Sequence, residues 1–394
     1  MGSQAELKMS REPEAGWRAW RDRIELRPVS WAILVYLASR VLLLAVAVTA
    51  SRLTHTSLLS ELGRWDGTWE VKIASTGYPH RIAHAPSTLG FFPLLPLLIW
   101  LLVHAPGPPN STVVAGVLIS TVGGLIATLL ILQLTTEWWG PRAGRRATAL
   151  FCVFPGSIVF SMVYGEGLLV PLAAGCILAL ERRRWLLAGA LAGAGTAVQP
   201  DAIVLIAVCA VVAGLEFHER GWRDPATRRS LVAPLLSGLG IGGFAVYLWA
   251  WTGTPLASLK AQHYGWGERI NPAALLDQGQ ALWRNISTGH WMHDLGPLAA
   301  VVGTGVLAVG LVLLLRRPRT ISAPALAWTL GIAVVAVLSQ NVPPNPRILI
   351  TAFPAVLVLA RSCSGWRLGC LIGTSTLLLI LTSALTYGGH TLTP

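Results

Sequence analysis

Asp66 is the residue whose neighbours most suggest chemistry. It lies in an Arg-Trp-Asp-Gly run at residues 64–67, with Trp69 just beyond, directly after a long apolar stretch. A carboxylate among tryptophans at a membrane surface would be partly desolvated, which makes it a stronger base than one in water. Such a base could take the proton of a hydroxyl group while indole rings stack on a sugar. Alternatively, Asp66 caps a helix that begins near residue 68, since aspartate is a favoured N-cap.

Composition indicates a helical membrane protein. Of the 394 residues, 53% are hydrophobic and only 12% are charged, whereas about 25% of a soluble domain is charged. Apolar runs of near-bilayer length recur between residues 31 and 387, so we expect an all-α polytopic membrane protein. The net charge of +12 could suggest nucleic acid, but the bases form short clusters between apolar runs. Such clusters are typical of membrane proteins, and we expect no nucleic-acid partner.

The clusters of lysine and arginine predict the orientation, because such clusters stay on the cytoplasmic side. They lie in the amino-terminal segment and at 142–146, 182–184, 220–229, 316–319 and 361–367. We therefore expect residues 1–28 to form a cytoplasmic amphipathic segment without a signal peptide. The protein is predicted to be a multi-pass protein of the cell (plasma) membrane with a cytoplasmic amino terminus.

A transmembrane domain is predicted over residues 29–388, followed by a short outer tail, 389–394. About eleven spans are expected: 29–52, 111–134, 147–163, 167–181, 185–199, 201–216, 231–251, 297–315, 323–340, 347–361 and 368–388. The apolar stretch 89–105 is left out because charge parity permits one crossing before the 142–146 cluster. It is also short and carries two prolines, so we expect it to lie in the outer interface. Two outer loops, 53–110 and 252–296, are predicted to form the active site.

Four segments resemble, in order, those of one membrane-enzyme family. They are residues 64–79 with Phe91 to Pro96, Phe154 to Glu166, Thr254 to Arg269, and Arg347 to Pro354. Together they resemble the PIG-V family, which comprises GPI mannosyltransferase 2 and its bacterial relatives among the GT-C glycosyltransferases. The resemblance covers nearly the whole chain. It implies a GT-C fold with juxtamembrane helices in the first outer loop, a polyprenyl-phosphate sugar donor on the outer side, and Asp66 as the base.

Other outer residues are candidates for binding the two substrates. Glu166, in a tight outer turn, could hold acceptor hydroxyls, pair with Arg347 or be solvated. Arg347 is the strongest candidate for the donor phosphate, because it follows a proline-rich turn and arginine suits phosphate geometry. Further candidates for the donor phosphate are Lys72, Lys260 and Arg269. Those for substrate binding are Arg64, Trp65, Trp69, Glu166, Gln262, His263 and Trp266. Each base could instead be an interfacial anchor.

Four further residues raise separate questions. Gln199 stands where the family often has arginine, and Gly165 where it often has threonine. Glu70, one helical turn after Asp66, is expected to face Lys72 or solvent. Arg40 is a charge inside the first span, and it either has a function or pairs within the bundle.

We expect an inverting mannosyltransferase that uses a polyprenyl-phosphate-mannose donor and a glycolipid or glycan acceptor in the bilayer. Positioning and electrostatics would do most of the work, because the lipid phosphate is a good leaving group. No metal or other cofactor is expected, and His290 with His293 lacks a third ligand for zinc. The alternatives are a GT-C transferase of another polyprenyl-phosphate sugar and a lipid or solute transporter, which would need polar or broken helices within the membrane. The acceptor, the linkage and the oligomeric state are open.

Overall fold

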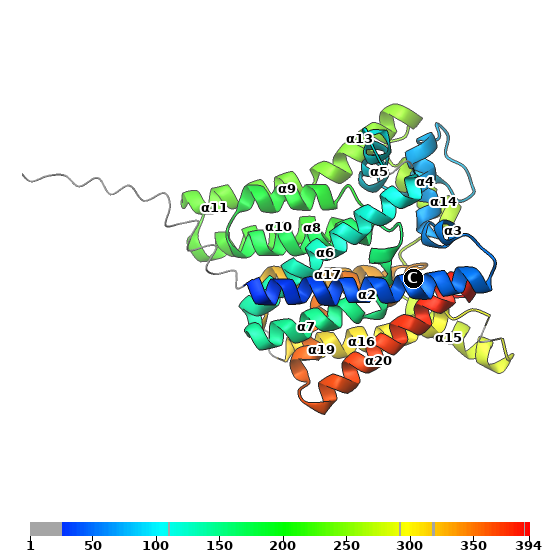
Figure 1. Cartoon of the computed structure of the whole chain (residues 1–394). Coiled ribbons are helices and arrows are strands. Elements are labelled where there is room, and N and C mark those ends of the chain that lie inside the picture. The colour runs from blue at the N-terminus through cyan, green and yellow to red at the C-terminus, as the bar shows by residue number, and fades with distance from the viewer. Residues whose placement is uncertain (1–25, 109–110, 291–292, 317–319, 390) are drawn as a thin grey trace, which may run out of the picture.

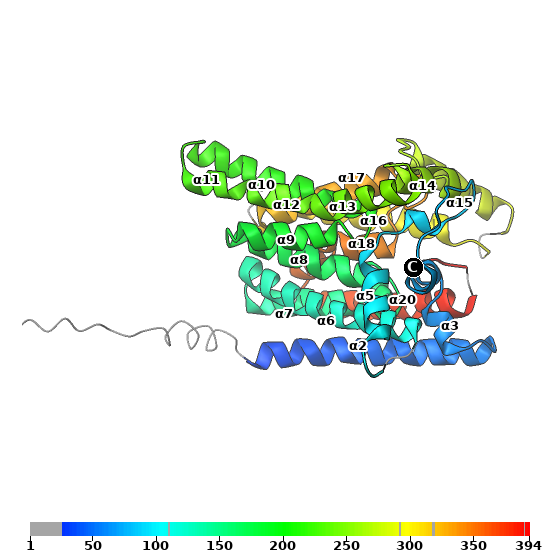
Figure 2. The same cartoon turned by 90° about the horizontal axis from the view of Figure 1, so that it is seen from above.

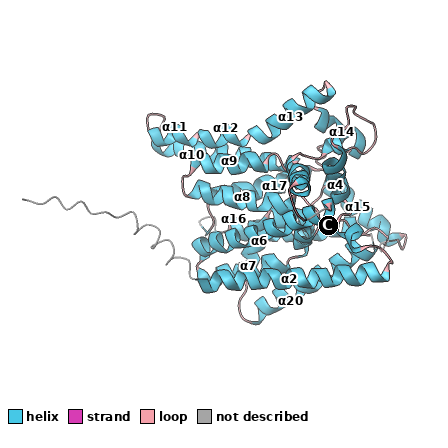
Figure 3. Cartoon of the chain, turned by 45° about the horizontal axis from the view of Figure 1, so that its top comes forward, coloured by secondary structure: helices cyan, strands magenta, loops and turns pink. Residues whose placement is uncertain are grey.

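The computed structural model describes residues 26–108, 111–290, 293–316, 320–389 and 391–394. Most of the predicted amino-terminal segment, 1–28, lies outside these ranges. Within them the chain consists of helices joined by loops, without a named strand (Figure 3). The prediction of an all-α protein is confirmed.

The two longest helices of the first part of the chain lie along one side of the bundle (Figures 1 and 2). α2 (Leu26–Leu53) and α6 (Thr112–Trp139) have 28 residues each. At about 1.5 Å per residue each exceeds the roughly 30 Å of a bilayer core. α7 (Pro141–Val153) turns back after Gly140, whose φ of +83° favours glycine, and packs against both long helices.

Arg40 ties α2 to the segment that follows α7. Its guanidinium donates to the backbone oxygen of Ser157 at 2.6 Å and to that of Cys152 at 3.2 Å. These carbonyl groups are available because α7 ends before Pro155 and the chain continues as a short 3-10 helix, η2 (Pro155–Ser161). The charge inside the first span therefore has a structural role in this bundle.

Short helices between α2 and α6 gather at one end of the molecule, away from α11 (Figure 1). They are α3 (Leu58–Leu62), α4 (Asp66–Thr76), η1 (Thr88–Gly90) and α5 (Leu94–His104). α5 has 11 residues, about 16 Å of helix, which is too short to cross a bilayer core of about 30 Å. Its length agrees with the prediction that this stretch does not cross.

The middle of the chain adds a second row of helices. They are α8 (Glu166–Glu181), α9 (Trp185–Gly195), η3 (Pro200–Ile203), α10 (Val204–Arg220), α11 (Pro225–Ser230), α12 (Val232–Ser237) and α13 (Leu239–Thr252). α8 packs against both α6 and α9, and α9 packs against α12. α8 thus joins this second row to the first helices.

The carboxyl-terminal part closes the bundle and places α14 near α4. Its elements are α14 (Ala257–Trp266), α15 (Ala274–Ser287), α16 (Gly296–Leu315), α17 (Ala323–Leu338), α18 (Pro346–Thr351), α19 (Phe353–Ser362), α20 (Trp366–Ala384) and the π-helical turn η5 (Leu385–Gly389). Figure 1 shows α14 at the α4 end of the molecule. α18 packs against η2 and α8, so it lies inside the bundle.

The count of eleven spans is not confirmed. Six helices of the described chain are long and apolar enough to cross a membrane, or seven if η2 and α8, bent by 108°, form one span. Several predicted spans correspond to shorter apolar helices, among them α9, α17 and α19. The predicted span 147–163 is instead broken between α7 and η2, because Pro155 interrupts the helical hydrogen bonds.

Candidate active site

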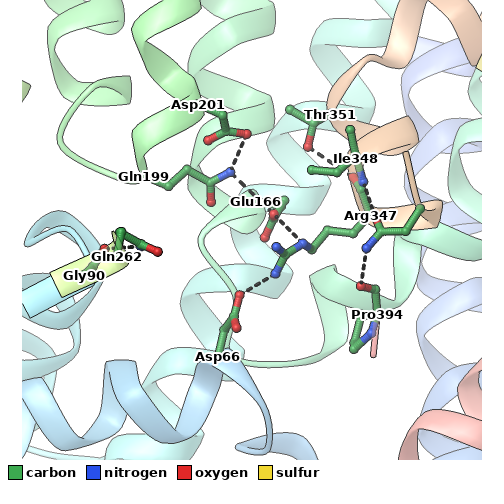
Figure 4. Close-up of polar contacts among 11 residues, drawn as sticks. Asp66, Gly90, Glu166, Gln199, Asp201, Gln262, Arg347, Ile348, Thr351 and Pro394 are labelled. Carbon is green, nitrogen blue, oxygen red and sulfur yellow. Dashed lines mark hydrogen bonds and ion pairs between the residues drawn. The ribbon is translucent and has the colours of Figure 1, made fainter. Parts of the chain in front are cut away.

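One guanidinium joins the two predicted acids. Arg347 Nη1 donates to Asp66 Oδ2, and Arg347 Nε lies 3.3 Å from Glu166 Oε1 (Figure 4). The side chains of Asp66, Arg347 and Glu166 are 38%, 16% and 2% exposed. Asp66 is therefore the member of the cluster that solvent reaches, and Glu166 is the buried one.

The turn before α4 holds Asp66 against the bundle. Trp65 is the N-cap, with a φ of +60° and no side-chain cap hydrogen bond, a backbone conformation that is rare outside glycine. The Val163 amide donates to the Leu62 oxygen at 3.1 Å, and a Cβ at Gly67 would lie 3.0 Å from Val163 Cβ. The first turn of α4 thus lies directly on the segment that leads to Glu166. Asp66 is the first helical residue and does not cap the helix.

Glu166 begins α8 in a polar turn shared with η3. Gln199 Nε2 lies 3.4 Å from Glu166 Oε1 and 3.1 Å from Asp201 Oδ2. A Cβ at Gly165 would lie 2.6 Å from Gln199 Oε1. The two positions that depart from the resembled family are therefore in contact. A side chain at position 165 would have to displace the amide that binds both acids.

α18 fixes the position of Arg347. Asn345 caps this helix by accepting from the Ile348 amide at 3.0 Å, and its own amide donates to the Pro394 oxygen at 3.3 Å (Figure 4). The guanidinium of Arg347 lies over the Tyr164 ring, 5.6 Å from its centroid. The cation is therefore held between a capped helix and a buried ring, so its two ion pairs are preorganised.

Three aromatic rings from the two loops predicted to lie outside meet beside α4. Trp69 stacks on Phe91 with centroids 6.0 Å apart, and Trp266 meets Trp69 edge-on at 5.1 Å. Gln262 donates to the Gly90 oxygen at 2.9 Å and so ties α14 to η1. The buried Trp266 Nε1 has no hydrogen-bond partner among the described residues. The structure thus brings the predicted loops 53–110 and 252–296 together, as a ring surface suited to a sugar face.

Three predicted residues near Asp66 make contacts of their own. Arg64 pairs with Glu61 at 3.1 Å. Lys72 places its ammonium group 5.7 Å from the centroid of Trp69. Trp65 packs against the apolar core of the bundle. These contacts lie around the acid cluster and leave Arg347 as the cation that contacts Asp66 in the described chain.

The remaining predicted bases lie on the exposed surface of the second loop. His263 is exposed, with Nδ1 3.3 Å from the Glu268 oxygen. Lys260 and Arg269 are also exposed. The structure does not bring these three side chains into the contact network of Asp66, Glu166 and Arg347, and their role as donor-phosphate or substrate ligands stays a prediction.

The sequence led us to expect Glu70 to face Lys72 or solvent, but its side chain is buried. It is only 4% exposed, on the face of α4 that also buries Gly67, Ile73 and Ala74. Burial raises the pKa of its carboxyl well above the ordinary range, and the nearby Asp66 and Glu166 raise it further. The only sequence signal was the four-residue spacing from Asp66, which places both on one side of a helix.

An apolar crevice runs along the bundle between α5, α6, α8 and α9. Its volume is about 720 Å³, and leucines from all four helices dominate its walls. Leu94 of α5 and Leu168, two residues after Glu166, line it, and Arg182 and Arg184 lie on its border. The crevice therefore extends from near the acid cluster toward a predicted cytoplasmic arginine cluster.

Within the part of the chain that the structure describes, there is no group of three or more His, Cys, Asp or Glu side chains that could hold a metal ion. His290 and His293 lie with ring centroids 5.8 Å apart. The expectation that the reaction needs no metal stays a prediction.

Comparisons with solved structures identify the architecture. No family model and no curated protein matches this chain. ArnT from Cupriavidus metallidurans, in a crystal structure bound to undecaprenyl phosphate, matches with a TM-score of 0.53 and 15% identity, over 92% of this chain and 75% of ArnT.

The chain has the GT-C fold. The oligosaccharyltransferase of Archaeoglobus fulgidus, tethered with an acceptor peptide containing the NVT sequon, matches with a TM-score of 0.50 and 13% identity. That match covers 92% of this chain but 56% of the oligosaccharyltransferase, so this chain spans little more than half of its length. The GT-C fold confirms the predicted architecture, and membership of the PIG-V family stays a prediction.

Proposed function

We propose that this protein is an inverting glycosyltransferase that moves mannose from a polyprenyl-phosphate donor to a hydroxyl group of a glycolipid or glycan acceptor. The observation that carries the proposal is the cluster of Asp66, Glu166 and Arg347 beside an aromatic surface, at one end of a GT-C bundle. The GT-C fold supports a lipid-linked donor, because ArnT was crystallised with undecaprenyl phosphate.

Asp66 is the proposed general base. Its carboxylate is the one in the cluster that solvent reaches, so an acceptor hydroxyl can approach it. In the proposed step the acceptor oxygen bonds to C1 of mannose while the bond from C1 to the phosphate oxygen breaks. The hydroxyl proton moves to Asp66, and the electron pair leaves with the lipid phosphate. A single displacement of this kind inverts the configuration at C1.

Arg347 is the proposed ligand of the donor phosphate. It already neutralises one exposed and one buried carboxylate, and an incoming phosphate would offer it a further anionic partner. Charge-assisted bonds between arginine and phosphate are strong and directional. A guanidinium that turned toward phosphate would release the Asp66 carboxylate oxygen that it now contacts, which could then accept the hydroxyl proton.

The apolar crevice is the proposed path of a substrate's lipid chain. It has a wall of leucines and a volume of about 720 Å³, and one of its ends is near Glu166. A hydrophobic tail in this crevice would leave its headgroup at the acid cluster. The clustered arginines at the far end support a cytoplasmic location for that end, and hence an active site on the outer face of the cell membrane.

A transporter is the second candidate, because the helix pair η2 and α8 is bent by 108° directly before Glu166. Broken helices that carry charged residues form substrate sites in many transporters. Whereas a transporter would move an unchanged molecule across the bilayer, an enzyme would change it.

Reconstitution of the purified protein into vesicles distinguishes the two. The vesicles contain polyprenyl-phosphate-mannose with labelled mannose, together with candidate glycolipid acceptors. We expect label to move to a glycolipid, and donors that carry glucose or arabinose to be used less well. Movement of donor or acceptor across the bilayer without any transfer of sugar would reject the enzyme and support the transporter.

A further inference from the structure

Glu70 is a buried acid that the proposed chemistry does not use. It is 4% exposed, and its face of α4 packs against α5 and α6. Four residues separate it from Asp66, so their Cβ atoms lie about 5–6 Å apart on one side of the helix. Glu70 is therefore part of the acid cluster in space, although Arg347 contacts the other two members.

The charge balance at this cluster is uneven. Asp66 and Glu166 share the cation of Arg347, whereas Glu70 has no ion pair among the described residues and its Oε2 atom, shielded from solvent, has no hydrogen-bond partner there. An ionised carboxylate without a partner is costly to bury. With all three acids ionised, the cluster would carry one positive and three negative charges.

Other charged groups lie around Glu70, but within the described part of the chain none of them forms an ion pair with it. On its own helix are Asp66 and Lys72, whose ammonium group lies over the Trp69 ring. Its other titratable neighbours are Glu166 at the start of α8 and Tyr78, whose hydroxyl donates to the Phe91 oxygen at 3.0 Å.

α5, η1 and α6 pack against α4, and they carry His104 at the end of α5 and Glu137 in the last turn of α6. Two further segments touch α4: Tyr164 follows Val163, which lies against Gly67, and α14, whose Trp266 ring meets Trp69, carries the exposed Lys260, His263 and Tyr264. Burial raises the pKa of the Glu70 carboxyl, so the acid is neutral below that raised value and ionised above it.

We propose that Glu70 is kept protonated as a positioning residue and that its proton sets the affinity of the site for the anionic donor. The inference rests on the proposed function, since the donor is a polyprenyl-phosphate sugar. A neutral Glu70 leaves Arg347 able to bind phosphate, because the cluster then has only one excess negative charge. Ionised Glu70 adds a second negative charge beside the phosphate and weakens donor binding.

The first test asks whether the proton is present and needs no turnover. Infrared spectra of the purified protein at neutral pH are compared with those of Glu70→Gln. We expect the wild type to show a protonated-carboxyl C=O band that the variant lacks, while Glu219→Gln, an exposed glutamate at the end of α10, keeps the band. Identical spectra for the wild type and Glu70→Gln would overturn the inference.

The second test measures KM for polyprenyl-phosphate-mannose from mildly acidic to alkaline pH. In the wild type we expect KM to rise roughly tenfold as Glu70 ionises, a change equivalent to about one pKa unit of interaction, while kcat stays nearly constant. Glu70→Gln, which cannot ionise, should keep the low KM and lose this rise. Glu70→Ala controls for packing. Equal pH profiles for the wild type and Glu70→Gln would reject the role of Glu70 while leaving the transferase intact, whereas absence of transfer by the wild type would reject the proposed function itself.

Discussion

Replacing Arg347 with methionine should destabilise the protein, because the change removes the cation that Asp66 and Glu166 share. Glu166 is 2% exposed and would lose its cation, while the Gln199 amide stays 3.4 Å from its oxygen. Breaking a buried ion pair by removing one partner costs about 3–5 kcal/mol. Asp66 is 38% exposed, so water screens its charge and its share is about 0–1 kcal/mol.

A double-mutant cycle with Glu166→Gln separates these two contributions. Glu166→Gln removes the buried charge and leaves Arg347 paired with Asp66. In that background Arg347→Met should lose only the exposed ion pair with Asp66. The free energy of unfolding should then fall by about 1 kcal/mol, instead of about 3–5 kcal/mol. The expected coupling is therefore about 2–4 kcal/mol, at the upper end of values for residues in contact.

Thermal unfolding of the purified variants in detergent measures this coupling. Arg347→Met should lower the unfolding midpoint by several degrees more in the wild type than in the Glu166→Gln background. Arg269→Met changes an exposed arginine of the predicted loop 252–296, so it is the matched control and should leave the midpoint unchanged. Equal losses in both backgrounds would show that Arg347 is not the counter-ion of Glu166, and the reasoning would fail.

Two further changes test how the bundle holds the site. Arg40→Met removes donors to the Ser157 and Cys152 carbonyls and should cost about 1–3 kcal/mol, because a buried acceptor is left unsatisfied. The loss should appear as a lower unfolding midpoint, whereas the exposed Arg52→Met should have no effect. Glu268→Ala removes a carboxylate that accepts two hydrogen bonds, one from Ser339 Oγ at 2.9 Å and one from the backbone amide of Asn341 at 3.1 Å. Limited proteolysis of the loop 252–296 should then be faster, and an unchanged rate would reject the anchoring role.

The sequence predicted the ingredients of the site better than their arrangement. Charge parity placed Asp66, Glu166 and Arg347 on one side of the membrane, and the structure joins them although 281 residues separate Asp66 from Arg347. Pairing of Glu166 with Arg347 was one of three open roles. The sequence could not choose among them, because the choice depends on distances between helices far apart in the chain.

Glu70 and Arg40 are two residues whose surroundings could not be predicted from the sequence. The spacing of Glu70 from Asp66 indicated a shared helix face, but not that this face packs against α5 and α6. Arg40 was visible as a charge in an apolar span, but its partners are carbonyls exposed by η2, within a stretch that the sequence predicted as one regular span. In both cases tertiary packing decides burial, and periodicity alone does not report it.

The lengths of the helices limit the topology in the same way. The short α5 agreed with the prediction, because Pro93 directly before it and Pro96 inside it are visible in a short apolar stretch of the sequence. The count of eleven spans is not confirmed, since apolar segments such as α9 and α19 form helices of 11 and 10 residues. Composition identifies an apolar segment, but not where its helix ends or bends.

The most direct test of the proposed chemistry compares the wild type with Asp66→Asn in single-turnover transfer from polyprenyl-phosphate-mannose. Asparagine keeps the shape of the side chain but cannot accept the hydroxyl proton. General-base catalysis contributes about 10²–10⁴-fold, so we expect the rate to fall by that factor, while Glu219→Gln retains the wild-type rate. A wild-type rate for Asp66→Asn would contradict the assignment of Asp66 as the base and the mechanism built on it.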